Sequence, residues 1–399
     1  MFSRRTNWNL EDNRITRLLR EKRRNGTSLT DLTESNPTQC GLELPKARLR
    51  DLLHADNCRY DPDPRGSLTA REAIAQLYAR ADVQVTPEQI FLTSGTSEAY
   101  SHLFRLLCNP GDSVFGPRPS YPLFEHLAQL ADISLLLYDL HYDGEWHIEP
   151  DEIAEQVRPR LKGMILIHPH NPTGMLIRKA SWERMKRVLE KRGSSLIADE
   201  VFSAYRFTAG NGDVGSFAAN DSILTFTLNG LSKLAGLPQL KLGWIVVSGP
   251  ASLRQEAMQR LEVITDAFLS VSTPVQNALP AILDAITELT NPIRNRITAN
   301  LRSLHSAIPA GGPVTLLSPE GGWNAVLRLP DVWSDEEWCL KLLERENTVV
   351  HPGHYFEFGR GSYVVLSLLP DVSEFAEGIS RINRVVSEAA FSVPGTLRG

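Results

Sequence analysis

Apolar positions in the central part of the chain fall into short runs that alternate with segments of helical periodicity. A run of four to eight apolar residues is typical of a buried strand, whereas apolar residues spaced by three and four are typical of a helix. Strands are predicted at 89–93, 164–168, 195–198 and 222–228, and helices at 96–107 and 179–191. This alternation, from about residue 55 to residue 275, predicts an α/β sheet with short crossovers.

The pattern changes towards the C-terminus. Residues 255–305 are largely helical and are expected to bridge two domains. The last hundred residues contain strand candidates at 314–317, 323–329 and 362–368, joined by helical patterns near 334–346 and 371–390. These patterns predict a smaller α+β domain. We expect residues 1–50 to form an N-terminal arm and part of the small domain, 51–285 the large domain, and 286–399 the C-terminal small domain.

Lys233 has the most informative surroundings of any residue in the chain. It follows an apolar strand candidate, within the loop Gly230-Leu231-Ser232-Lys233-Leu234-Ala235-Gly236-Leu237-Pro238. A lysine at the end of a buried strand is expected to lose solvent, and burial lowers the pKa of an amine. An unprotonated amine can form a Schiff base with an aldehyde. Taken by itself, the segment is also compatible with an ordinary surface lysine.

Polar residues of complementary kinds follow three other predicted strands. Asn171 stands in an Asn-Pro-Thr-Gly turn, Asp199 ends an apolar run, and Ser94-Gly95-Thr96-Ser97 precedes a helical pattern. Free backbone N–H groups at a helix start suit a phosphate group. Each segment also has a purely structural explanation: an Asn-Pro turn, a helix cap or strand-end carboxylate, and a capping box.

Taken in chain order, these four segments resemble the class I/II aminotransferase family of fold-type I pyridoxal-5′-phosphate enzymes. The resemblance covers roughly residues 25–390, and Asn-Pro-Thr-Gly and Ser-Lys-x-x-Gly-Leu-Pro are its most specific parts. It implies an aminotransferase-like α/β fold, with a large domain whose mostly parallel sheet is flanked by helices and a smaller α+β domain. It also implies pyridoxal 5′-phosphate as the cofactor, and transfer of an amino group from an amino acid to a 2-oxo acid.

The resemblance implies a catalytic role for two of these residues. Lys233 would hold the cofactor as an internal aldimine and then act as the general base and acid for proton transfer at the substrate. Asp199 would pair with the pyridine nitrogen and keep it protonated, so that the ring can accept electrons. Asn171 would donate a hydrogen bond to the phenolic oxygen of the ring.

Further positions match cofactor-binding residues of the family. Gly95, Thr96 and Ser97, with Ser232, would cradle the phosphate. Tyr121, in Pro-Ser-Tyr-Pro, would stack on the ring, unless it is a tyrosine of the turn core. Tyr60 resembles the tyrosine that reaches the phosphate across a dimer interface, which implies a homodimer. Residues 30–50, which include Asn36, are expected to cross near the substrate site.

The chain departs from the family pattern beside the ring and the phosphate. Three residues after the aspartate, the usual tyrosine is replaced by Phe202, and loss of this donor is expected to raise the pKa of the aldimine. Tyr205, three residues further on, is a candidate replacement. Lys241 stands where an arginine usually grips the phosphate, which exchanges a bidentate fork for a point charge. Gly230 replaces a frequent serine and removes one possible donor.

The largest departure concerns the arginine that binds the substrate α-carboxylate in many members. The matching position is Val365, in Tyr-Val-Val-Leu-Ser-Leu, and an apolar side chain cannot bind a carboxylate. We expect Arg360 to bind the substrate instead, with Arg328 and Arg118 as further candidates. A substrate that is not held by its α-carboxylate is the alternative.

Composition narrows the remaining function classes. The chain has 399 residues, 42% of them hydrophobic and 22% charged, with a net charge of −5, which argues against nucleic acid as a main partner. No apolar run approaches the ~20 residues of a membrane span, and no export signal is evident at the N-terminus. Four scattered cysteines lack metal-ligand spacing and suggest reduced thiols in a cytoplasmic protein. We expect no metal site.

The motifs favour an aminotransferase but do not exclude related chemistry. A pyridoxal-phosphate-dependent β-eliminating (C–S) lyase would share all four segments, and the loss of arginine at Val365 leaves this alternative open. A cofactor-binding regulator would require a DNA-binding module, for which the roughly thirty residues before the crossing segment are too few.

Overall fold

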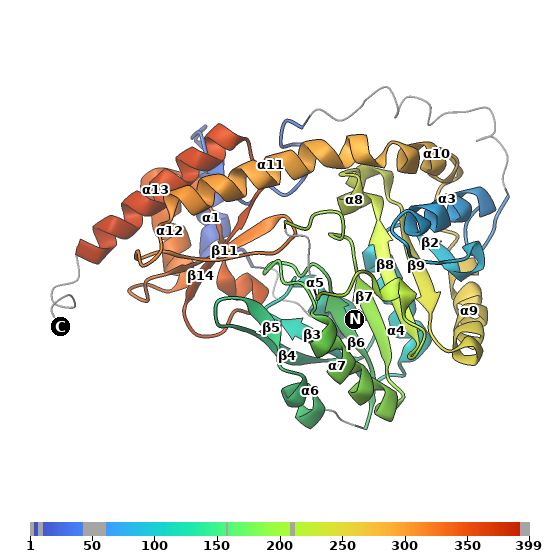
Figure 1. The fold of residues 1–399 in the computed structure, drawn as a ribbon. Helices are drawn as coiled ribbons and strands as arrows, with labels where there is room; N and C mark the ends of the chain where they lie inside the picture. The colour runs from blue at the N-terminus through green and yellow to red at the C-terminus, as the bar shows by residue number, and fades with distance from the viewer. Residues whose placement is uncertain (1–3, 7–10, 43–60, 157–158, 208–211, 392–399) are drawn as a thin grey trace.

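The computed structural model describes residues 4–6, 11–42, 61–156, 159–207 and 212–391. An eight-stranded sheet forms the centre of the large lobe, in the order β2-β9-β8-β7-β6-β3-β4-β5 (Figure 1). Its strands are β2 (Ile90–Thr93), β3 (Ser113–Arg118), β4 (Ser134–Tyr142), β5 (Trp146–Ile148), β6 (Leu161–Ile167), β7 (Ser195–Asp199), β8 (Thr225–Gly230) and β9 (Gly243–Ser248). The pairs β4·β3, β3·β6, β6·β7 and β7·β8 are parallel, whereas β9 is antiparallel to both of its neighbours and β5 is antiparallel to β4.

Helices cover both faces of this sheet. Its helices are α3 (Leu68–Ala79), α4 (Thr96–Leu107), α5 (Leu123–Leu130), α6 (Pro150–Gln156), α7 (Lys179–Arg192), α8 (Leu231–Leu234), α9 (Ala251–Asp266) and α10 (Thr273–Asp284). Successive residues of a strand point to opposite faces. On β7, Leu196 packs into the core under α6 and α7, while Ile197 packs into the core under α4, α5 and α9. This burial on both faces explains the continuous apolar runs in the sequence.

The smaller lobe contains a four-stranded antiparallel sheet in the order β10-β11-β14-β13. Its strands are β10 (Thr315–Leu317), β11 (Asn324–Leu329), β13 (His351–Pro352) and β14 (Ser362–Ser367), and its helices are α1 (Arg14–Arg24), α12 (Asp335–Glu346) and α13 (Val372–Phe391). The long helix α11 (Ile286–Ala307) extends from the large lobe to the small one (Figure 1). The predicted α/β class, with a smaller α+β part, is thus confirmed.

The N-terminal segment joins the small lobe. Strand β1 (Thr30–Asp31) pairs in parallel with β12 (Thr348–Val349), far away in the sequence. Short 3₁₀ helices complete the described chain: η1 (Arg4–Thr6), η4 (Pro87–Gln89), η5 (Phe217–Ala219), η6 (Pro238–Leu240) and η7 (Gly353–Phe356). The division of the chain near residues 50 and 285 stays a prediction, with which the distribution of the two sheets agrees. No helix in the described part of the chain is long and apolar enough to cross a membrane.

Two predicted element boundaries differ from the structure for local reasons. The strand predicted from residue 222 begins only at Thr225, because the Asn220 amide donates to the Ile223 carbonyl and the Thr225 hydroxyl and holds a turn there. The helical stretch predicted at 255–305 is interrupted after Asp266, and Leu269 takes a left-handed conformation with φ 46°. The stretch is largely helical, as predicted, and consists of the three helices α9, α10 and α11.

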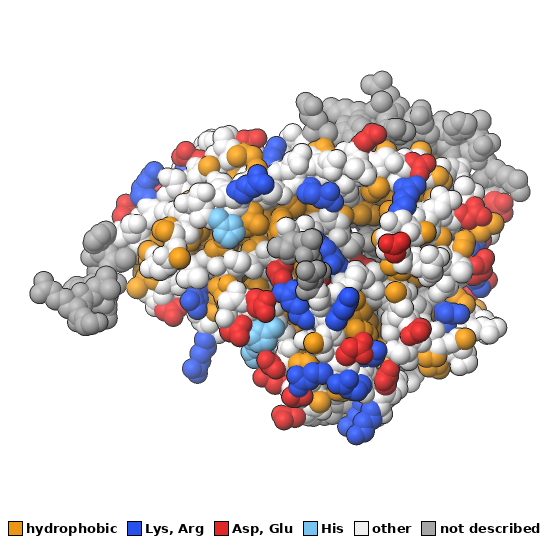
Figure 2. Space-filling view, viewed as in Figure 1, with side chains coloured by type: hydrophobic (Ala, Val, Ile, Leu, Met, Phe, Trp, Pro, Cys, Tyr) orange, Lys and Arg blue, Asp and Glu red, His pale blue; other side chains and the backbone are white. Residues whose placement is uncertain are grey.

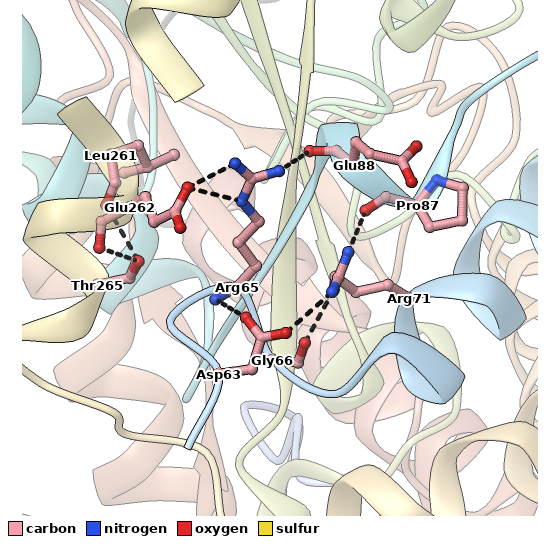
Figure 3. Close-up of polar contacts among 9 residues, drawn as sticks. All are labelled: Asp63, Arg65, Gly66, Arg71, Pro87, Glu88, Leu261, Glu262 and Thr265. Atoms are coloured by element: carbon pink, nitrogen blue, oxygen red, sulfur yellow. Dashed lines mark hydrogen bonds and ion pairs between the residues drawn. The ribbon is translucent and has the colours of Figure 1, made fainter. Parts of the chain in front are cut away.

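A buried arginine holds the turn that leads into α3 (Figure 3). The Arg71 guanidinium is 7% exposed and donates to the carbonyls of Gly66 and Pro87, at 2.8 and 2.9 Å. It also pairs with the Asp63 carboxylate at 3.0 Å. Two of the three contacts are to the turn at residues 63–66 and the third is to η4, so one side chain fixes this turn against η4.

The neighbouring Arg65 ties the same turn to α9. Its Nε donates to Glu262 at 3.0 Å, one terminal nitrogen donates to the Glu88 carbonyl at 3.2 Å, and the guanidinium lies 5.4 Å from the ring centroid of Phe91. The turn is therefore anchored on two sides, by α9 and by η4 (Figure 3).

We predict that Arg71→Met lowers the free energy of unfolding by about 3 kcal/mol, because it leaves the buried Gly66 carbonyl and the partly buried Pro87 carbonyl without their donor. Urea denaturation monitored by circular dichroism measures this change. Arg80→Met is the matched control: the Arg80–Asp284 pair is exposed, so its loss should change stability by about 0.5 kcal/mol or less. Equal effects of the two substitutions would contradict the assigned role of Arg71.

Candidate active site

The polar strand ends meet at one edge of the large sheet. Because β6, β7 and β8 run in parallel, the segments that follow them lie side by side. They line a cavity of about 380 Å³ between the large and small lobes. Nine of the predicted site residues line it: Gly95, Thr96, Ser97, Tyr121, Asn171, Asp199, Ser232, Lys233 and Lys241.

Asp199 is a buried carboxylate at the end of β7. Its Oδ2 accepts a hydrogen bond from the Tyr100 hydroxyl at 3.0 Å, and its Oδ1 accepts one from the Val201 backbone N–H at 3.2 Å. Burial nevertheless raises the pKa of Asp199 to about 6, and the nearby charge of Lys233 opposes this shift only in part. A carboxylate in this state is stabilised by a cation placed against it within the cavity.

Lys233 belongs to α8 and enters the cavity from the end of β8. Burial lowers the pKa of its amine, and the Asp199 carboxylate acts in the opposite direction. The Nζ atom lies 5.2 Å from the ring centroid of Trp323 and 6.0 Å from that of Phe202. The amine therefore stands between an acidic side and an aromatic side, with its neutral, nucleophilic form favoured by burial.

Backbone donors gather at the start of α4. Gly95 is the N-cap residue and no side chain caps this end, so N–H groups of the first turn are available to a ligand. The Glu98 carboxylate accepts from the Ser94 N–H at 2.7 Å, one residue before the N-cap, so the expected capping box is not formed at this helix start. Thr96, Ser97 and Ser232 add hydroxyls to the lining, and Lys241 adds a positive charge.

Glycines allow the strands to approach one another at this end of the cavity. A Cβ atom on Gly230 would lie 2.9 Å from the Gly243 Cα, and one on Gly243 would lie 3.1 Å from the Gly95 Cα. The serine frequent in the family at position 230 would not fit here without a shift of β9. Gly230, expected from the sequence to remove a hydrogen-bond donor, is therefore required for the close packing of β8 against β9.

An amide pair spans the two lobes at the other side of the cavity. The Asn324 Nδ2 donates to the Asn171 Oδ1 at 2.7 Å, and both residues line the cavity. Tyr121 also lines the cavity and is 47% exposed. Thr33 and Ser35, from the crossing segment after β1, complete the lining.

This donor set fits pyridoxal phosphate. The cavity combines a buried carboxylate for a ring nitrogen, a buried amine for an aldehyde, an uncapped helix start with hydroxyls and a lysine for a phosphate, and an exposed tyrosine ring for stacking. Among the described residues, no group of three or more histidine, cysteine or acidic side chains is suited to a metal ion.

Three of the expected site residues do not line this cavity. Tyr205 is fully buried, is absent from the cavity lining, and its hydroxyl lies 3.0 Å from the carbonyls of Lys233 and Leu234. It supports the backbone of the lysine and does not replace the donor lost at Phe202. Asn36 lies at the mouth of the cavity, where its side chain accepts from the Thr38 backbone and hydroxyl. Tyr60 lies outside the described residues.

The third is Arg360, which lies with the other two candidate arginines. Arg360, Arg328 and Arg118 all border a different cavity, beside β4 and β5. Val365 is 1% exposed and packs into the core, and none of the described residues that line the active-site cavity is an arginine. Arg118 is moreover paired with Asp139 through two hydrogen bonds, at 2.5 and 2.7 Å. The expectation that Arg360 binds the substrate does not fit this arrangement.

On the face of the molecule drawn in Figure 2, charged side chains of both signs are interspersed among the described residues.

Comparison with known proteins identifies the class. The family model described as aminotransferase class I and II matches residues 28–374. A glutamate-pyruvate aminotransferase of Haemophilus influenzae is 26% identical over 91% of this chain and 92% of its own length, and an alanine aminotransferase of Mycobacterium bovis is 26% identical over 90% and 85%. An alanine aminotransferase structure from Pyrococcus furiosus superposes with a TM-score of 0.86 at 22% identity, covering 97% of this chain and all of that one.

The chain therefore belongs to the class I and II aminotransferase family. It is a pyridoxal-phosphate-dependent transferase, and the resemblance seen in its motifs is confirmed.

Asp199 makes the stability of the cofactor-free protein depend on pH. Its pKa in the folded state lies above the unfolded value of 3.8, so the stability it contributes is lost as the pH rises from about 4 through about 6. We predict that Asp199→Asn gains stability relative to wild type over this range, by up to about 3 kcal/mol. Urea denaturation of both proteins without cofactor, between about pH 4.5 and pH 7.5, measures the difference.

Asp139→Asn provides a control without pH dependence in this range. The Arg118 guanidinium lowers the pKa of Asp139 below its unfolded value of 3.8, so this carboxyl is ionised in both states, and the variant should differ from wild type by a constant amount between about pH 4.5 and pH 7.5. A pH-independent difference for Asp199→Asn would mean that this carboxyl is not held in a desolvated environment.

Proposed function

We propose that the protein transfers an amino group from an amino acid to a 2-oxo acid, with Lys233 as the residue that moves the reacting proton. The observation that carries this proposal is the burial of a lysine amine and a carboxylate in one cavity at the ends of parallel strands. The membership of the chain in the aminotransferase family supports the same reaction.

Pyridoxal phosphate supplies, when bound, an electron sink for the bond that breaks at the substrate α-carbon. Asp199 would hold a proton at the ring nitrogen, because its buried carboxylate is most stable opposite a cation. Lys233 Nζ, whose neutral form is favoured by burial, would take a proton from the substrate and return it. Asp199 would thus hold the charge on the ring nitrogen, and Lys233 would transfer the proton.

The other cavity residues bind and orient. We assign the phosphate to the N–H groups at the start of α4, with Thr96, Ser97, Ser232 and Lys241 around it. Tyr121 would cover the ring. These contacts hold the reacting atoms within reach of Lys233, which is the usual role of remote binding groups in catalysis.

Two further residues act on the side of the ring oxygen. Asn171 would donate to this oxygen, and Phe202 offers no second donor. Phe202 and Trp323 instead place apolar rings beside the Lys233 amine and exclude water from it. A drier site strengthens the electrostatic contact between Asp199 and its partner.

The relatives named above are aminotransferases, and none of them is a lyase. The absence of arginine at Val365 remains the only feature that favoured a β-eliminating lyase, and it does not by itself establish elimination. We therefore do not put forward the lyase as a second candidate.

We also propose a homodimer in the cytoplasm. The apolar residues Val263, Phe268 and Leu269, at the end of α9 and just beyond it, are 73%, 50% and 38% exposed, and burial against a second copy of the chain would remove them from water. Light scattering should give twice the 44.5 kDa mass of the chain.

The described cysteines, Cys40, Cys108 and Cys339, are free thiols, which supports a reducing compartment.

The reaction is tested by supplying amino donors without an oxo acid. We predict that one donor of a panel yields at most one equivalent of its 2-oxo acid per active site, and that adding a second 2-oxo acid restarts turnover. Chromatography of both products measures this stoichiometry. Lys233→Ala should reduce the rate by about 10³-fold or more, because it removes the proton carrier.

Lys241→Ala is the control, since it should weaken binding of the cofactor yet retain turnover when the cofactor is saturating. Continuous release of ammonia and pyruvate with no acceptor present would contradict aminotransfer and identify a lyase.

A further inference from the structure

Asn324 makes a contact that links the small sheet to the active site. It is the first residue of β11, opposite Ser367 of β14, and its Nδ2 donates to the Asn171 Oδ1 at 2.7 Å. Neighbouring backbone hydrogen bonds hold it in place, since Leu368 N–H donates to the Trp323 carbonyl at 2.7 Å. Asn324 therefore approaches Asn171 from a fixed strand.

Asn171 is held equally firmly on its own side. The turn that contains it is closed by hydrogen bonds from the His170 N–H to the Met175 carbonyl at 2.9 Å, and from the Gly174 N–H to the His170 carbonyl at 2.8 Å. With the backbone fixed, the main freedom left to the Asn171 side chain is rotation of its amide plane. Rotation by half a turn exchanges the carbonyl oxygen and the NH₂ group at nearly the same volume.

We infer that Asn324 is a positioning residue that selects one of these two orientations. Because Asn324 donates to the Asn171 oxygen, the NH₂ group of Asn171 is the end left to face the cavity. This inference rests on the proposed function, in which Asn171 donates a hydrogen bond to the ring oxygen of pyridoxal phosphate. In the opposite orientation, the Asn171 carbonyl would face that oxygen, and two acceptors would repel each other.

The orientation matters more here because Phe202 has no hydroxyl and Tyr205 points to backbone carbonyls. A donor to the ring oxygen favours the charged form of that oxygen, and so the state of the bound cofactor with one proton fewer. Asn324 thereby sets the pH at which the bound cofactor changes protonation, although we do not assign it any contact with the cofactor.

The Asn324–Asn171 hydrogen bond also connects the two lobes. Asn171 follows β6 of the large sheet, whereas Asn324 belongs to the small sheet, so the donor is oriented only when the two sheets are packed as observed. The small lobe would thus act on the ring oxygen through one amide–amide hydrogen bond.

Asn324→Asp tests the inference with almost no change of shape. A carboxylate accepts hydrogen bonds and cannot donate, so the Asn171 NH₂ group should turn towards it and present the carbonyl to the cavity. Asn324→Leu removes the contact without imposing the reverse orientation, and it serves as the second variant if the aspartate variant does not fold. Circular dichroism establishes folding for each protein.

Two quantities are measured with pyridoxal phosphate and no amino donor: its dissociation constant, by fluorescence titration of the cofactor-free protein, and the pH midpoint of its visible absorbance change. We expect Asn324→Asp to weaken binding about tenfold and to raise the midpoint by about one unit, with smaller changes in the same direction for Asn324→Leu. In an Asn171→Ala background, Asn324→Leu should change the affinity by less than about twofold, because its effect passes through Asn171.

Wild-type affinity and midpoint in both Asn324 variants would overturn the inference. So would an Asn324→Leu effect of full size in the Asn171→Ala background, since Asn324 would then act by another route. A failure of the proposed function would appear in the assay of product formation from amino donors. It is therefore distinguishable from the dissociation constant and the pH midpoint measured here without an amino donor.

Discussion

The burial of Asp199 and Lys233 in one cavity is the constraint on which the rest of this structure depends. Each group is ionisable, and each is shifted by burial towards its neutral form, to a pKa of about 6 for the carboxyl and to a lowered pKa for the amine. Burial of these two groups lowers the stability of the cofactor-free protein. A bound ligand that places opposite charges against them offsets this cost. The instability of the free site and the chemistry of the loaded site thus have the same origin.

The large sheet produces this arrangement by its topology. Parallel pairing brings the ends of β6, β7 and β8 to one edge, and glycines at 95, 230 and 243 let the backbones approach closely at the start of α4. The small sheet then covers the other side. Its contribution through Trp323 and Asn324 is a set of contacts to residues that the large sheet has already placed. The site therefore belongs to both lobes.

Much of the fold and part of the site could be predicted from the sequence because the relevant signals are local. An apolar run followed by a polar turn marks a strand end, and Asn171, Asp199 and Lys233 each follow such a run. The remaining features arise from contacts between distant segments. Tyr100 lies within α4, a position that no local pattern distinguishes, yet its hydroxyl meets Asp199, 99 residues away. Asn324 meets Asn171 across 153 residues.

The direction of individual side chains also could not be predicted from the sequence. Tyr205 has the spacing of a replacement donor, but its hydroxyl turns to the Lys233 carbonyl. Arg360 has the charge of a carboxylate clamp, but its strand-end position places it at a different cavity. In both cases the residue type is compatible with the expected role and the packing is not. Sequence spacing determines which residues are near in the chain, whereas packing determines where their polar atoms point.

The most direct test of the central claim is to locate the covalent attachment of the cofactor. The protein is incubated with pyridoxal phosphate, reduced with borohydride, digested and analysed by peptide mass spectrometry. The account predicts a single labelled peptide that carries the reduced cofactor on Lys233, and a loss of this label in Lys233→Ala. Label on Lys241, which lines the same cavity, or no label at all, would contradict the assignment of Lys233 as the reactive amine.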